Sequence, residues 1–148
     1  YIDDEIIELN ALALMLDDRT LSSQTHINAT SYNGVVLLTG EAPGESLRDR
    51  IVQITRDIPS VRAVHNEIAL QAPSTLAERA KDSLITGKVK IALLKDNKIN
   101  SVRVKVVTER GNVYLMGIVR QHEADRITEV ARRVPGVQRV VKVMEYIE

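Results

Sequence analysis

The sequence contains no cysteine, no tryptophan and no phenylalanine, and only 3% of its 148 residues are aromatic. The absence of cysteine excludes disulfide bonds, thiolate zinc sites and a cysteine nucleophile. With so few aromatic rings, the chain lacks stacking platforms for nucleic-acid bases and cages for cationic ligands. We therefore expect a core built from aliphatic side chains.

The chain also lacks net charge and a long apolar run. Twenty basic and twenty acidic residues cancel to a formal net charge of zero, so no overall field attracts nucleic acid or a membrane. The longest apolar run, Ala11 to Leu16, is far shorter than the roughly 20 residues that span a bilayer. The first residue is Tyr1 and no signal-peptide core follows, so we expect a processed or trimmed form.

One motif occurs twice. The pattern Gly-x-Val-x-Leu-x-Gly fills residues 34–40 and recurs at residues 111–117. Further along, Ile58-Pro59 with Val61 matches Val134-Pro135 with Val137 at nearly the same separation. The separation is 77 residues for the glycine motif and 76 for the later matches, so the second copy has lost one residue between them, and the repeat indicates two copies of one module. We place the first domain at residues 1–72 and the second at residues 73–148, with a linker at 71–75.

Each copy predicts the order helix, strand, strand, helix, strand. Alternating and helical apolar spacing, the Asn33-Gly34 turn and the helix-stopping Pro59 define these elements. The first copy gives a helix at 4–16, strands at 26–31 and 35–39, a helix between Pro43 and Pro59, and a strand at 61–70. The second copy gives elements near 75–95, 101–108, 112–119, 121–134 and 137–147. The fold class is α+β, with two tandem αββαβ modules, each a small three-stranded sheet packed on two helices.

The helix at 4–16 is apolar around nearly its whole circumference, with Glu8 and Asn10 as the main polar interruptions. Such a helix predicts burial on two sides. One side would face its own sheet and the other would face the second module.

The two copies carry opposite charge. Residues 1–72 contain five bases and eleven acids, a net charge of −6, whereas residues 73–148 contain fifteen bases and nine acids, a net charge of +6. The zero total is therefore a cancellation, and the second module alone would be drawn to anionic surfaces.

The helix at 75–95 has two apolar faces. Ile85, Val89 and Ala92 align with core positions of the first copy and predict the core side. The opposite face is bordered by basic side chains, an arrangement with which a helix lies on an anionic bilayer. The predicted phospholipid-binding residues are Leu76, Arg79, Ala80, Lys81, Leu84, Gly87, Lys88, Lys90, Ile91, Leu94 and Lys95. Packing of this face against the first module explains the pattern equally well.

Other polar residues give no pattern for chemistry. Glu78 and Asp82 lie on the basic helix and are expected to weaken its field. His26, His65 and His122 lack metal-ligand spacing and are expected at the surface, while acids at the helix ends, such as Asp4 and Asp18, suit the helix dipole better than a cation site. We predict no catalytic residue, no metal site and no cofactor.

The repeated Gly-x-Val-x-Leu-x-Gly, a following helix and then Pro-x-Val-x-x-Val at residues 59–64 and 135–140 together resemble the BON domain, a bacterial αββαβ module. The resemblance covers nearly the whole chain. Membership would imply a non-enzymatic protein of the cell envelope that binds phospholipid. The nearest members with two such domains imply a periplasmic place at the inner face of the outer membrane, held by a lipid anchor outside this sequence.

The sequence thus predicts a non-catalytic phospholipid-binding envelope protein that supports outer-membrane integrity, with its second module docked on anionic phospholipid. The alternative is a protein-interaction module that binds an envelope partner through the same helix face. Nucleic-acid binding is disfavoured because no aromatic platform or recognition motif accompanies the basic charge. We expect a monomer.

Overall fold

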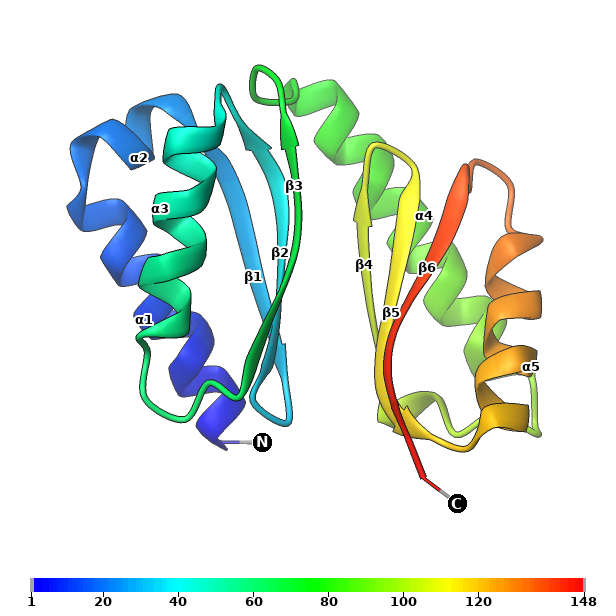
Figure 1. The fold of residues 1–148 in the computed structure, drawn as a ribbon. Helices are drawn as coiled ribbons and strands as arrows, with labels where there is room; N and C mark the ends of the chain where they lie inside the picture. Colours follow the sequence, from blue (N-terminus) through cyan, green and yellow to red (C-terminus); the bar gives the residue numbers. More distant parts are fainter. Residues whose placement is uncertain (1, 148) are drawn as a thin grey trace. The chain divides into compact units, whose positions relative to one another are not determined.

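The computed structural model describes residues 2–147, and the chain divides into two compact units between Ser74 and Thr75 (Figure 1). The first unit contains α1 (Ile2–Asp17), α2 (Arg19–Gln24), β1 (His26–Tyr32), β2 (Val35–Ala42), α3 (Glu45–Arg56) and β3 (Ala63–Leu70). The second contains α4 (Leu76–Lys95), the 3₁₀ turn η1 (Ser101–Arg103), β4 (Val104–Glu109), β5 (Asn112–Val119), α5 (Gln121–Arg132) and β6 (Arg139–Tyr146).

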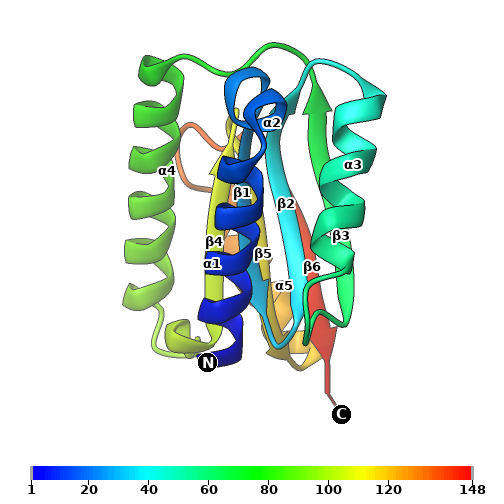
Figure 2. The same ribbon diagram turned by 90° about the vertical axis from the view of Figure 1, so that its left-hand side faces the viewer.

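Both units have the same sheet topology. The central strand β2 pairs antiparallel with β1 and parallel with β3, and β5 pairs in the same way with β4 and β6. In the first unit α1 lies over β1 and α3 over β3, as Figure 2 shows, and in the second α4 contacts β4 while α5 contacts β6. The predicted fold class, two αββαβ modules with three-stranded sheets on two helices, is confirmed.

Alternation along the central strands places one set of side chains against the helices. Val36, Leu38 and Ala42 are buried in the first core with Ile7 and Ile51, and the second core repeats the arrangement with Val113, Leu115, Val119, Ile85 and Ile127. Among the described residues, both clusters contain only aliphatic side chains and methionine. The expected aliphatic core is confirmed for these two clusters, while one aromatic side chain, Tyr114, is buried outside them at 1% exposure.

Glycine closes the repeated motif because two backbones meet there. A Cβ added at Gly40 would lie 1.9 Å from the carbonyl oxygen of His26, and one added at Gly117 would lie 2.7 Å from that of Arg103. Gly40 also has a φ of +113°, a conformation that L side chains rarely adopt. The last position of the motif therefore requires glycine, because a larger residue would collide with the backbone on the antiparallel side of the central strand.

Two short elements were not predicted. Helix α2 follows α1 directly, and the side chain of Asp18 caps it by accepting hydrogen bonds from Thr20 N at 3.0 Å and Leu21 N at 3.2 Å. In the second unit η1 takes the first three residues of the predicted strand at 101–108, and Val102 is 91% exposed. An element of three to six residues is too short to show an apolar period in the sequence.

Helix α1 is buried on one side. Ile7, Ala11 and Met15 enter the first core, whereas Ile6, Leu9, Leu12 and Leu16 are between 49% and 65% exposed. Within the first unit this helix is therefore covered on one side only, and its cover by the second module stays a prediction.

Candidate functional site

Helix α4 separates a core side from an exposed side. Ile85, Val89 and Leu93 are buried, and Ala92 packs against the same cluster, which confirms the core side expected from the alignment of the two copies. Thr75 begins the helix with a capping box in which its hydroxyl oxygen accepts from Glu78 N and the Glu78 carboxylate accepts from Thr75 N. The helix is thus fixed at its start and along one side.

The eleven residues predicted to bind phospholipid form the exposed face of α4. Nine are exposed, and the other two, Arg79 and Gly87, are partly buried. The large apolar members are strongly exposed, with Leu76 at 80%, Leu84 at 65%, Ile91 at 55% and Leu94 at 72%. An aliphatic stripe of this size in contact with water is the usual sign of a membrane or protein contact.

Basic side chains border this stripe on both sides. Lys81, Lys88 and Lys95 recur every seven residues and therefore follow one border in steps of about 10 Å. All three are exposed, as is Lys90 on the opposite border. Long lysine side chains extend along an apolar surface and place the ammonium group at its rim. The arrangement suits a planar surface that is apolar within and anionic at its boundary.

The two acids of α4 accept hydrogen bonds from backbone amides. Glu78 is engaged in the capping box, and the backbone N–H of Thr75 holds the pKa of its carboxyl below the usual value. Asp82 is buried and points to the hairpin turn between β4 and β5. Asp82 therefore lies on the core side of the helix, and the expectation that it weakens the field of this face stays a prediction.

Asp82 holds the turn by accepting two backbone hydrogen bonds. Its Oδ2 accepts from Arg110 N and its Oδ1 from Gly111 N, both at 2.9 Å. Arg110 and Gly111 have φ values of +52° and +76°, the signature of a type I′ turn with two adjacent amides exposed. A carboxylate is a strong acceptor for such a pair. Asp82 therefore fixes the first helix of the module to its hairpin.

The first module contains the same clamp. Asp4 Oδ1 accepts from Gly34 N at 2.9 Å and from the Ser31 hydroxyl at 2.7 Å, and Oδ2 accepts from Asn33 N at 2.8 Å. The sequence predicts only a favourable interaction of Asp4 with the helix dipole. Its carboxylate is in addition buried and bonded to the turn between β1 and β2. An aspartate three residues before a core isoleucine, Asp4 before Ile7 and Asp82 before Ile85, is the repeated signal that could have revealed both clamps.

Acid should weaken the first clamp. Burial would raise the pKa of Asp4, but hydrogen bonds from Gly34 N, the Ser31 hydroxyl and Asn33 N outweigh it and hold the pKa well below its usual range. Because this pKa is lower in the folded protein than in the unfolded chain, the ionised carboxylate stabilises the fold at pH values above the unfolded pKa of about 4. This stabilisation is lost as the pH falls below that value. We expect Asp4→Asn to cost about 2 kcal/mol at pH 7 and progressively less below about pH 4. Urea titrations across this pH range measure it, and a pH-independent difference would contradict it.

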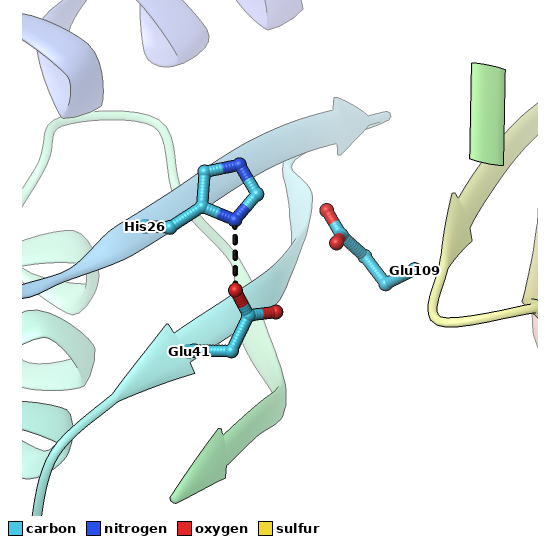
Figure 3. A group of neighbouring side chains, drawn as sticks. All are labelled: His26, Glu41 and Glu109. Carbon is cyan, nitrogen blue, oxygen red and sulfur yellow. Dashed lines mark hydrogen bonds and ion pairs between the residues drawn. The ribbon is translucent and has the colours of Figure 1, made fainter. Parts of the chain in front are cut away.

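His26 is partly buried and paired, unlike the surface histidine predicted. Its Nδ1 lies 3.0 Å from Oε1 of Glu41 (Figure 3). Glu41 is fully buried, and the same oxygen accepts from Ser74 N at 2.7 Å. The Ser74 hydroxyl lies 3.5 Å from the same Nδ1. A serine nucleophile needs the ring nitrogen opposite the one that faces the carboxylate. This geometry therefore ties β1, β2 and the linker together and does not activate Ser74.

None of the helices in residues 2–147 is long and apolar enough to cross a membrane.

Comparison with known proteins identifies both modules. The model of the BON domain family matches residues 3–72 and 81–148. The chain is 33% identical to the outer membrane lipoprotein DolP of Haemophilus influenzae and 35% identical to the 21 kDa hemolysin of Actinobacillus pleuropneumoniae, in both cases over 99% of this chain and 76% of the relative. It is 28% identical to the osmotically-inducible protein Y of Escherichia coli over 95% of this chain and 71% of that protein. The chain belongs to the BON domain family and carries two copies of the domain.

Proposed function

We propose that this chain is a non-catalytic protein of the bacterial envelope that docks on anionic phospholipid through the exposed face of α4. The observation that carries the proposal is the pairing of a strongly exposed aliphatic stripe with lysines on both borders. The acids of the same helix are engaged in a cap and a buried turn. The exposed face itself contains five basic residues and no acid, so positive charge dominates it.

The energetics favour shallow attachment. Each basic side chain near an anionic surface contributes about 1 kcal/mol, and the five on this face act together. Insertion of Leu84 and its apolar neighbours to the level of the acyl boundary adds the hydrophobic term. We expect micromolar binding that depends on anionic lipid and weakens with salt.

The relatives support a place in the envelope. One is named an outer membrane lipoprotein, and we propose the same location for this chain, at the periplasmic inner face of the outer membrane and with a lipid anchor. Surface docking by α4 would then hold the second module against the membrane. We propose that this contact supports the integrity of the outer membrane.

Vesicle flotation tests the proposal. The intact chain should float with vesicles of phosphatidylglycerol and phosphatidylcholine and remain behind with phosphatidylcholine alone. Indifference to anionic lipid would overturn the proposal and favour an envelope protein as the partner of the same face.

Charge reversal at one border should weaken attachment. Lys81→Glu with Lys88→Glu replaces two exposed cations without touching the core, and we expect at least a tenfold loss of affinity for anionic vesicles. Salt at about 0.5 M should have a similar effect on the parent because it screens exposed charges. The matched control is Arg103→Glu with Lys142→Glu, an equal charge change at exposed sites of η1 and β6 in the same module, which should bind nearly as well as the parent. Equal affinity of parent and Lys81/Lys88 variant in high and low salt would contradict the electrostatic mechanism.

A further inference from the structure

The large exposed apolar side chains of the described chain gather on two helices. Nine of the thirteen lie on α1 or α4. The face of α4 is explained by the proposed lipid contact, but the face of α1 is not. We define the acidic face of α1 as Ile6, Leu9, Leu12 and Leu16 with the exposed acids Asp3, Glu5 and Asp17.

This face is unsuited to anionic lipid. Helix α1 contains acids at both ends and no basic residue along its 16 residues. An anionic bilayer would repel the acidic borders while its interior attracted the leucines. The occupant that suits this face is therefore apolar in the middle and basic at its borders.

The surface beside α1 is hollowed. A groove of about 460 Å³ is lined by Leu9, Leu12, Met15 and Ile27, with Glu5 and Glu8 among its polar residues. Glu8 accepts a hydrogen bond from Ser31 N at 2.7 Å, which holds its carboxylate at the edge of β1. Aliphatic side chains of a docked helix would enter this groove between acidic groups.

The exposed face of α4 has the complementary chemistry. It presents Leu84, Ile91 and Leu94 between lysines, on a helix about 30 Å long, and α1 is about 24 Å long. We propose that α1 of one copy of this chain docks against α4 of a second copy, with apolar stripes in contact and acidic borders opposite basic borders.

The proposed contact is weak and does not close at a dimer. The two stripes supply four or five large side chains each, well below the 20 to 30 residues a side of a stable interface. Because the two surfaces differ, each contact leaves one α1 and one α4 unoccupied, so association continues beyond a dimer as concentration rises. Dilute protein is a monomer, and lipid bound to α4 competes with the second copy.

Sedimentation velocity of the intact chain without lipid tests the contact. From about 10 µM to about 500 µM in low salt, the weight-average sedimentation coefficient should rise, and about 0.5 M salt should suppress the rise. Glu5→Lys with Asp17→Lys should weaken association at least tenfold, while Glu45→Lys with Asp57→Lys, an equal charge change at exposed sites at the start and the C-cap of α3, should leave it nearly unchanged.

A charge swap identifies the partner surface. Lys81→Glu with Lys88→Glu should also prevent self-association, but mixing this variant with the Glu5/Asp17 variant should restore it, because the basic α1 of one then meets the acidic α4 of the other. No concentration dependence in the parent, or no recovery in the mixture, would overturn the proposal. The Glu5/Asp17 variant should still float with anionic vesicles, so failure of lipid binding and failure of self-association are observed separately.

Discussion

Leu84→Glu is expected to abolish binding to anionic vesicles while lowering the free energy of unfolding by at most about 0.5 kcal/mol. Leu84 is 65% exposed in the middle of the exposed face of α4. A carboxylate there remains solvated in the free protein, but it must lose its water and face lipid phosphates when the helix docks. Flotation measures the first effect and thermal unfolding the second.

The neighbouring residue provides the matched control. Ile85→Glu places the same charge one position along the helix, where the side chain is only 3% exposed and packs in the second core. It should cost several kcal/mol and unfold the module, because a buried carboxylate without a partner is strongly unfavourable. A folded Leu84→Glu protein that still floats with anionic vesicles would exclude this face as the lipid contact.

Asp82→Ala is expected to lower the stability of the second module by about 3 kcal/mol. The change leaves the amides of Arg110 and Gly111 without their carboxylate at the turn between β4 and β5. Asp82→Asn should cost less, because one amide oxygen remains as an acceptor. A urea titration followed by NMR signals of each module separates this loss from the stability of the first module.

Asp125→Ala is the control for Asp82→Ala. Asp125 is exposed on α5, and its side chain accepts from Gln121 at 3.0 Å. Its removal should change stability little. If Asp82→Ala and Asp125→Ala unfold at the same urea concentration, the carboxylate of Asp82 does not hold the turn. Vesicle binding of the folded fraction should be retained, since Asp82 lies on the core side of α4.

Repetition made the fold readable from the sequence. The motif at 34–40 and 111–117 placed both central strands, and β5 was found with its full bounds. Strand β2 was predicted to end at residue 39, before Gly40. In the structure Gly40 is part of the strand, which continues to Ala42. Helix α2 and the turn η1 were missed since local hydrogen bonds, and no apolar period, define them.

The orientation of α4 was also readable, because helical spacing assigns each residue an angle around the axis. Ile85 and Val89 are buried and Leu84 is exposed, as that spacing predicted. The same reasoning could not decide whether a second apolar side is covered. Both α1 and α4 have such a side, and within its own unit each side leaves large leucines exposed.

The sequence by itself determined the two modules, their αββαβ order, the aliphatic core and the opposite charges of the halves, because these follow from composition and from periods of a few residues. The tertiary structure decided where individual polar groups act. Asp4 and Asp82 lie about 30 residues from the turns they clamp, and His26 meets Glu41 across two strands. Contacts between residues so far apart leave no local period in the sequence, so only the folded chain shows which groups a carboxylate contacts.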